Sequence, residues 1–260
     1  MKILLTGSAG FIGSHLQPAL EKAGHTVVGY DLIFNQDIRN KYLLELFFEN
    51  GNFDLVIHLA ALAGVRRGER FPSEYISTNI TGTKNVVDAC VRFGVKRLIN
   101  FSSSSVYAES EGEKSEDSPS APKSIYGMTK LMAEMIVERA VIDTVTVRPF
   151  TVYGPRGRED QVIMRWVDMM KRKMPIQIYA NDEEDAGKII RCYTHVFDLV
   201  RGVLKIIENP TKIKVFNLGG STGVSLKDLV DIFDVKLLSY AGRQSGDVEY
   251  SVGNISRAKV

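Results

Sequence analysis

Cysteine is scarce in this chain, since only Cys90 and Cys192 occur among 260 residues. Two cysteines cannot form a disulfide framework or a cysteine-based metal site, so both are interpreted as inert core thiols in a reducing compartment. The four histidines are spread along the chain without the spacing of metal ligands. No metal site is therefore predicted.

An excess of charge of either sign is also missing. The sequence has 33 basic and 31 acidic side chains and a net charge of +2. Because basic and acidic residues are interleaved, nothing suggests a nucleic-acid partner. The 44% hydrophobic and 25% charged content excludes a disordered tail protein, and 260 residues suffice for one large domain plus a smaller lobe.

Long apolar runs are absent as well. No stretch approaches the roughly 20 apolar residues that span a bilayer. Gly7 follows the apolar residues 3–5 before the core of a signal peptide could build up. The sequence therefore predicts a cytoplasmic protein without a membrane partner.

Short apolar runs alternate instead with longer helical patterns, which is typical of a parallel sheet buried on both faces. We predict an α/β fold: a Rossmann-type doubly wound parallel sheet in residues 1–153, followed by a smaller substrate-binding lobe in residues 154–260. Residues 109–122, rich in Glu, Ser and Pro, are predicted to form a surface loop. The expected strands of the sheet are 2–6, 26–30, 54–59, 97–102 and 144–149, and the expected helices lie near 11–23, 39–50, 73–93 and 124–140. In the lobe, helices are expected near 161–173, 196–208 and 225–233, and strands at 176–179 and 214–218.

A glycine-rich turn follows the first predicted strand. Gly7, Gly10 and Gly13 stand three residues apart around Phe11 and Ile12, at the start of a helix. Such glycines let backbone N–H groups approach a pyrophosphate at a helix N-terminus.

Asp31 ends the next strand, 18 residues after Gly13. A carboxylate there accepts hydrogen bonds from ribose hydroxyls and repels a 2′-phosphate, which favours NAD over NADP. The alternative is a glycine-rich turn with a helix-capping aspartate. Asp37 and Ile38 are candidates to flank the adenine, and Leu59, Ala60 and Ala61 lie where a cofactor would pass, although simple core packing explains the two alanines equally well.

A candidate catalytic group comes later in the chain. Tyr126 and Lys130 stand four residues apart on one helix face, so the ammonium can lie beside the phenol. For a tyrosine to act as a base near neutral pH its pKa must fall by about 3, or about 4 kcal/mol, and a nearby cation favours this. Ser103, in the serine run 102–105, offers a hydroxyl for the reacting oxygen. Each feature alone is common, but their joint occurrence after a dinucleotide motif is not.

Together these residues resemble the extended short-chain dehydrogenases/reductases, within the NAD-dependent nucleotide-sugar epimerases and dehydratases. The resemblance implies that Tyr126 takes the proton of a sugar 4-hydroxyl, and Ser103 falls where that family places its catalytic serine or threonine. The matching segments also include Asn79 in 79–83, interpreted as cofactor-binding, and residues 148–155.

The residues after Ser103 distinguish reactions in that family. Dehydratases carry Asp-Glu there and decarboxylases carry Glu, whereas this chain has Ser104 and Ser105. The resemblance therefore implies a 4-epimerase, an isomerase. Segments 63–66, 151–158 and 244–247 are more similar to UDP-glucuronate 4-epimerases than to UDP-galactose 4-epimerases.

A uronate carboxylate needs donors, and we expect Arg158, Ser104 and Ser105 to meet it, with Thr151 beside the substrate. A solvated loop charge is the alternative for Arg158. Arg191 matches an arginine that contacts the nucleotide in the family. His195, which replaces a tyrosine of that motif, is interpreted as part of the pocket wall in preference to a catalytic residue.

Two competing hypotheses are an epimerase for UDP-glucose and UDP-galactose, or for UDP-sugars generally, and a non-catalytic NAD-binding regulatory protein. The resemblance further implies a homodimer through helices near 83–93 and 127–140. The chain is short for the family: only six steps separate Asp31 from Asp37, and relatives continue into a final helix where this chain has only residues 254–260. A trimmed substrate lobe is therefore expected.

Overall fold

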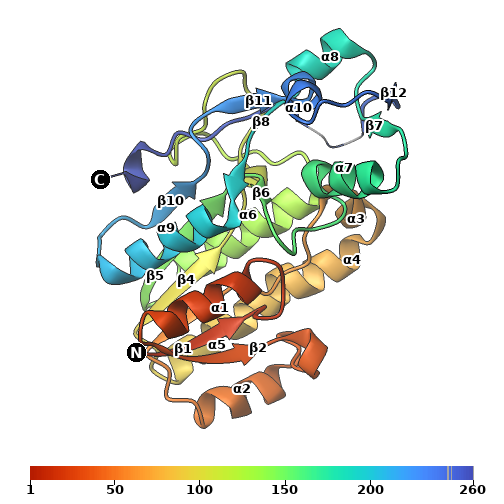
Figure 1. Cartoon of the computed structure of the whole chain (residues 1–260). Helices are drawn as coiled ribbons and strands as arrows, with labels where there is room; N and C mark the ends of the chain where they lie inside the picture. The colour runs from red at the N-terminus through yellow and green to blue at the C-terminus, as the bar shows by residue number, and fades with distance from the viewer. Residues whose placement is uncertain (245, 247, 260) are drawn as a thin grey trace.

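A parallel sheet of six strands forms the centre of the molecule (Figure 1). The computed structural model describes residues 1–244, 246 and 248–259. The strand order is β10-β5-β4-β3-β1-β2, and every neighbouring pair is parallel. The strands are β1 (Lys2–Thr6), β2 (Thr26–Tyr30), β3 (Leu55–His58), β4 (Arg97–Phe101), β5 (Asp143–Pro149) and β10 (Val215–Leu218).

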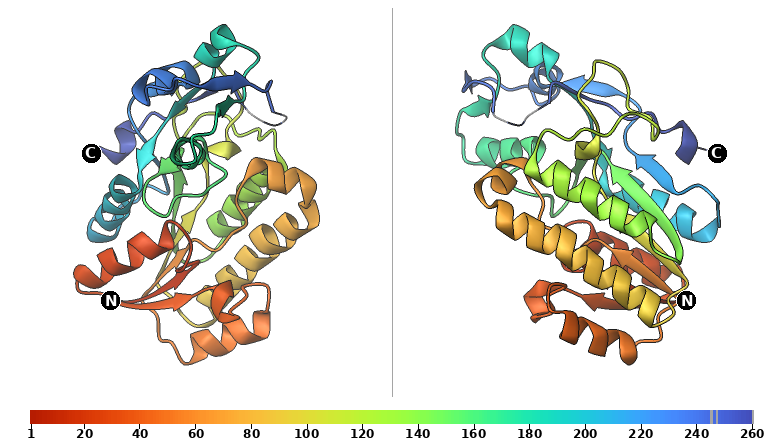
Figure 2. Two further views of the ribbon diagram at one scale, coloured as in Figure 1. Left: turned by 45° about the vertical axis from the view of Figure 1, so that its right-hand side comes forward. Right: turned by 180° about the vertical axis from the view of Figure 1, so that it is seen from behind.

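Two layers of helices cover the sheet, one on each face (Figure 2). Apolar side chains of α1 and α9 pack with Leu5 in one core, while those of α2, α5 and α6 pack with Leu4 in the other. Both leucines are fully buried, as expected for a strand covered on both faces. The predicted doubly wound fold is confirmed. The helices are α1 (Gly13–Lys22), α2 (Lys41–Glu49), α5 (Thr83–Arg92), α6 (Ile125–Glu138) and α9 (Val196–Glu208).

The placement of two elements in the smaller lobe was wrong. The strand expected at 214–218 pairs in parallel with β5, with Val215 opposite Thr146, and so extends the central sheet as β10. The helix expected at 196–208 is α9, which packs beside α1 on that sheet. Their position late in the chain did not reveal that the chain returns to the sheet.

The helix predicted at 73–93 is interrupted. It consists of α4 (Pro72–Tyr75), a π-helical segment η2 (Ile76–Gly82) and α5. Such wide turns often occur at functional sites. An unpredicted helix α3 (Val65–Arg70) precedes it.

The segment 109–122 is not simply a surface loop, as its composition suggested. Lys114 and Glu116 are buried. The Lys114 ammonium donates to the carbonyls of Ser110 and Gly112, at 2.6 and 3.0 Å. A carboxylate oxygen of Glu116 accepts a hydrogen bond from the backbone N–H of Asn217 in β10, at 2.9 Å. Charged residues can therefore be buried here because their polar atoms are bonded.

The remaining elements form small sheets above the carboxyl ends of the central strands (Figure 1). The helices α7, α8 and α10 with the strands β7, β11 and β12 share a separate core that includes Trp166, Ile176, Ile178 and Leu229. None of the helices in the described ranges is both long and apolar enough to cross a membrane. These elements are β6 (Val152–Tyr153), α7 (Val162–Lys171), β7 (Ile176–Ile178), α8 (Glu183–Lys188), β8 (Ile190–Cys192), β9 (Thr194–His195), β11 (Gly223–Ser225), α10 (Leu226–Ile232), β12 (Leu238–Tyr240) and β13 (Tyr250–Ser251); short 3₁₀ turns are η1 (Leu32–Phe34), η3 (Ser104–Val106) and η4 (Ser256–Ala258).

Candidate active site

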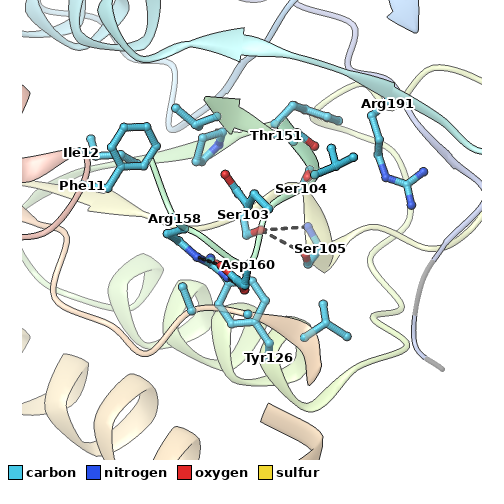
Figure 3. A pocket seen from close by; sticks show the side chains of 18 of the residues that line it. Phe11, Ile12, Ser103, Ser104, Ser105, Tyr126, Thr151, Arg158, Asp160 and Arg191 are labelled. Atoms are coloured by element: carbon cyan, nitrogen blue, oxygen red, sulfur yellow. Dashed lines mark hydrogen bonds and ion pairs between the residues drawn. The ribbon is translucent and has the colours of Figure 1, made fainter. Parts of the chain in front are cut away.

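A cavity of about 520 Å³ lies between the carboxyl ends of the central strands and the small sheets. Figure 3 shows Phe11 and Ile12 on one side, the serine run in the middle and Arg191 on the opposite side. Most of the residues predicted from the sequence line this cavity: Gly7, Gly10, Phe11, Ile12, Gly13, Leu59, Ala61, Ser103, Ser104, Ser105, Tyr126, Lys130, Thr151, Arg158 and Arg191.

The glycine turn forms the first wall of the cavity from backbone atoms. Gly7 has φ +72°, and a Cβ on it would stand 2.7 Å from the backbone nitrogen of Ala60. A Cβ on Gly13 would stand 2.2 Å from the carbonyl oxygen of Gly7. The turn therefore needs glycine at both positions. It opens α1, whose free N–H groups and dipole favour an anion, so this wall fits the pyrophosphate of NAD.

Asp31 lies beside this turn. One carboxylate oxygen accepts from the backbone N–H of Ala9 at 2.9 Å, and the other accepts from that of Ile33 at 3.1 Å. Asp31 therefore does cap a short helix, η1, which was the alternative to ribose binding. Each carboxylate oxygen accepts more than one bond, so the group can also receive ribose hydroxyls.

Asp37 and Ile38 do not line the cavity. The carboxylate of Asp37 pairs with the guanidinium of Arg39 at 2.6 Å, and hydrogen bonding to Arg39 lowers the pKa of that carboxyl. The side chain of Ile38 is 4% exposed and packs against Gly82. Both have structural partners in the protein, and contact with adenine stays a prediction.

Asn79 and Ala60 also lie outside the cavity wall. The Asn79 amide accepts from the N–H of Leu62 at 2.8 Å and donates to its carbonyl at 3.0 Å. It also donates to the hydroxyl of Thr129 at 3.0 Å. Asn79 thus ties the segment after β3 to α6. The backbone of Ala60 supports Gly7 from behind, so both residues shape the cofactor wall from outside it.

The candidate catalytic residues meet in the cavity. The Ser103 hydroxyl accepts from the N–H of Ser105 at 3.1 Å. Burial raises the pKa of Tyr126, while a hydrogen bond to Ser103 and the charge of Arg158 act against that increase. Burial lowers the pKa of Lys130 to about 8. Any further positive charge placed beside the phenol would favour its ionised form.

His58 supports this site as a neutral side chain. The Thr83 hydroxyl donates to the Asn79 carbonyl at 2.7 Å, so it accepts from Nε2–H of His58 at 2.9 Å. The other ring nitrogen then accepts from the Thr6 hydroxyl at 2.7 Å. Burial, with the charge of Lys130, lowers the pKa of His58 to about 3. His58 therefore connects β1, β3 and α5 without carrying charge.

The second wall consists of long cationic side chains. The guanidinium of Arg158 donates to both carboxylate oxygens of Asp160, at 2.9 and 2.5 Å. Arg191 donates to the carbonyls of Ile190 and Glu249, each at 2.8 Å. Both candidate substrate-binding arginines are thus oriented by the protein itself.

Sequence reasoning did not predict Arg165 and Tyr179 on this wall, and it named Arg66 only within the segment 63–66. Arg66 and Arg165 place their guanidinium groups 4.3 and 4.6 Å from the centre of the Tyr179 ring. An arginine on a lobe helix next to a cavity is a weak signal, and nothing in the sequence linked Tyr179 to either cation.

His195 does not line the cavity, so its predicted place in the pocket wall was wrong. It precedes α9, and Nδ1 accepts from the N–H of Phe197 at 3.4 Å. Its ring packs against Tyr153. Of the segment 244–247, Ser245 and Asp247 lie outside the described residues. Within the described part of the chain, no three His, Cys, Asp or Glu side chains gather as metal ligands.

The profile of the NAD dependent epimerase/dehydratase family matches residues 3–219. The chain belongs to this family. The resemblance inferred from the motifs is thereby confirmed. The family is NAD-dependent, and NAD is the cofactor that the glycine turn fits.

A relative of the chain agrees with that assignment. A UDP-glucuronate 4-epimerase of Thermodesulfobacterium geofontis is 33% identical over 291 aligned positions, covering 98% of this chain and 88% of the relative. The alignment of 291 positions is longer than the 260 residues of the chain. The relative therefore carries residues within the aligned region that this chain lacks.

Solved structures show the same fold. UDP-glucuronic acid 4-epimerase from Bacillus cereus, in complex with UDP-glucuronic acid and NAD, has a TM-score of 0.88 and 32% identity, covering 100% of this chain and 92% of that one. UDP-glucose 4-epimerase from Thermotoga maritima, with UDP-glucose, has a TM-score of 0.91 and 28% identity, covering 100% and 91%.

Proposed function

We propose that the protein is an NAD-dependent 4-epimerase that interconverts UDP-glucuronate and UDP-galacturonate. The observation that carries this proposal is the meeting of Ser103, Tyr126 and Lys130 in one cavity, followed by the hydroxyls of Ser104 and Ser105. No carboxylate follows the catalytic serine, which argues against an elimination. The similarity to UDP-glucuronate 4-epimerases supports the same substrate.

The residues of the cavity have distinct roles in this reaction. Bound NAD, held by the glycine turn and Asp31, supplies a reversible hydride acceptor at C4. Tyr126, as phenolate, removes the proton of the sugar 4-hydroxyl and later returns it, while the Lys130 ammonium stabilises the phenolate. Ser103 hydrogen-bonds the reacting oxygen. Because the hydride would return to the same carbon from the opposite face, C4 is inverted with no net oxidation.

The substrate would lie against the cationic wall. Arg191 would bind the diphosphate, and Arg158 with Ser104, Ser105 and Thr151 would bind the uronate carboxylate; all of them line the cavity. Charge-assisted bonds from an arginine suit both groups. A carboxylate would have to share Arg158 with Asp160, which already occupies two of its N–H groups.

That occupied arginine favours a second candidate, epimerisation of UDP-glucose and UDP-galactose, whose sugars carry no carboxylate.

Parallel assays of the purified protein with UDP-glucuronate and UDP-glucose, with products separated by chromatography, decide between them. We expect faster turnover of UDP-glucuronate. Tyr126→Phe should lower kcat about 10²- to 10⁴-fold with either substrate. Preferential turnover of UDP-glucose would replace the first candidate by the second, and unchanged activity in Tyr126→Phe would contradict both.

We also propose a homodimer formed through α5 and α6, which lie side by side (Figure 2). Met128, Met132 and Met135 form an exposed stripe at helical spacing on α6, and Val91 of α5 is 40% exposed. Burying such a stripe against a second copy would stabilise a dimer. Light scattering of the parent protein should give twice the mass of the chain, and light scattering of Met132→Glu should give the mass of a single chain. A cytoplasmic location stays a prediction.

A further inference from the structure

A buried ion pair fixes the helix that carries Tyr126 and Lys130. Glu134 of α6 and Arg148 of β5 have side chains only 10% and 8% exposed. Arg148 donates through Nε to one carboxylate oxygen at 2.9 Å and through Nη2 to the other at 2.6 Å. Two parallel bonds between planar groups define both distance and orientation. α6 cannot slide along β5 without breaking them.

Arg148 is itself held from other sides. Its Nη1 donates to the carbonyl of Glu116 at 3.1 Å, and its guanidinium lies 4.8 Å from the centre of the Tyr107 ring. The Tyr107 hydroxyl in turn donates to the Asn217 amide of β10 at 2.6 Å. The backbone of Glu116 and, through Tyr107, strand β10 thus hold the cation that holds Glu134.

Glu134 stands one helical turn after Lys130, so the two side chains share a face of α6. Within the described residues Lys130 forms no ion pair of its own. Burial lowers the pKa of Lys130, and the Glu134 carboxylate opposes that decrease. The other titratable or charged groups near it are His58 from β3, Tyr126 from α6 and, behind Glu134, Arg148 from β5.

We propose that Glu134, fixed by Arg148, is a positioning residue for Lys130: its carboxylate, held one helical turn from the lysine, keeps the ammonium protonated beside Tyr126. The catalytic importance of Glu134 rests on the proposed function. Its effect on the charge of Lys130 does not depend on that function. Arg148 balances the carboxylate, so the pair acts on Lys130 as an oriented dipole with its negative end nearer the lysine.

The two charges should have opposite effects on the Lys130 pKa when they are removed one at a time. Glu134→Gln leaves the Arg148 cation uncompensated and should lower the pKa by about one pH unit, whereas Arg148→Met leaves the carboxylate uncompensated and should raise it by about as much. Heteronuclear NMR titration of the full-length protein with ¹³C-labelled lysine measures this pKa directly, with Lys130→Met to assign the signal. The alkaline limb of the kcat profile should move the same way.

Glu138→Gln is the matched control, because Glu138 is exposed one turn further along α6 and should leave the pKa unchanged. The double variant Glu134→Gln/Arg148→Met should lower the pKa less than Glu134→Gln alone. If a lone buried charge prevents a single variant from folding, the double variant decides, and an unchanged pKa there overturns the proposal.

A purely structural pair would give a different result. Both single variants would then lower the melting temperature and leave the pKa of Lys130 at its parental value, which would contradict the proposal. If the pKa shifts as expected but no UDP-sugar is turned over, the positioning role holds and the proposed function fails.

Discussion

The two walls of the cavity are built from different parts of the chain. The cofactor wall is backbone: Gly7 and Gly13 touch neighbouring main-chain atoms so closely that no side chain fits. The opposite wall consists of long side chains, such as Arg158 and Arg191, held by bonds to their neighbours. A backbone wall is fixed by the fold, whereas a side-chain wall changes with single substitutions. The cofactor wall should therefore tolerate fewer substitutions, and the substrate wall should control specificity.

The largest effect is expected at the backbone wall. Gly7→Ala would place a Cβ 2.7 Å from the Ala60 nitrogen at φ +72°, so main-chain atoms must move. We expect a loss of about 2–4 kcal/mol in the free energy of unfolding, together with much weaker NAD binding. Urea unfolding and calorimetric titration with NAD measure both.

Gly94→Ala is a matched control for that substitution. Gly94 has nearly the same φ, +70°, but a Cβ there would have no neighbour within 4 Å. It should cost only about 1 kcal/mol for the backbone conformation and leave NAD binding intact. Equal losses in the two variants would show that the close approach at Gly7 does not matter.

His58 lies behind the cofactor wall, and its contribution to the free energy of unfolding should fall in acid. The pKa of His58 is about 3 in the folded protein, below its usual 6.5. Between these values the unfolded chain binds a proton that the folded protein does not. The His58 contribution is therefore complete above pH 6.5 and is lost as the pH falls toward 3, at about 1.4 kcal/mol per pH unit. Urea unfolding from pH 7 to pH 4 should show a flatter slope in His58→Gln than in the parent. Parallel slopes would contradict a neutral buried His58.

On the substrate wall, Arg158→Ala tests specificity. Loss of a charge-assisted bond to the uronate carboxylate should lower kcat/KM for UDP-glucuronate about 10- to 100-fold, with a smaller effect on UDP-glucose. Arg156→Ala is the control, because Arg156 lies exposed on the same loop. Steady-state rates with both sugars measure the difference. An equal loss of kcat/KM with both substrates would show that Arg158 does not bind the uronate carboxylate.

The same contrast explains what the sequence could predict. The five strands expected in the first half of the chain and the glycine turn follow from local spacing and occur where they were expected, and Tyr126 and Lys130 line one cavity. The position of β10, the burial of Glu116 and the bond from Arg191 to the Glu249 carbonyl depend on which distant segments meet. No local pattern encodes those contacts. Hence most of the cofactor wall was visible in the sequence, while the partners on the substrate wall were not.

The smallest effects on the free energy of unfolding are expected at two buried asparagines whose side chains differ in their hydrogen bonds. Asn100 of β4 is fully buried between His58 and Thr146 in register, and neither polar atom of its amide has a hydrogen-bond partner among the described residues. An unpaired buried polar group is costly, so Asn100→Leu should raise the free energy of unfolding by about 1 kcal/mol. Asn85 is the matched control, because its amide donates to the Ile38 carbonyl at 3.0 Å. Asn85→Leu should destabilise by about 1–2 kcal/mol, since it leaves that carbonyl unpaired. If thermal and urea unfolding show that both variants destabilise equally, the Asn100 amide is hydrogen-bonded in the folded protein, as it would be by buried water.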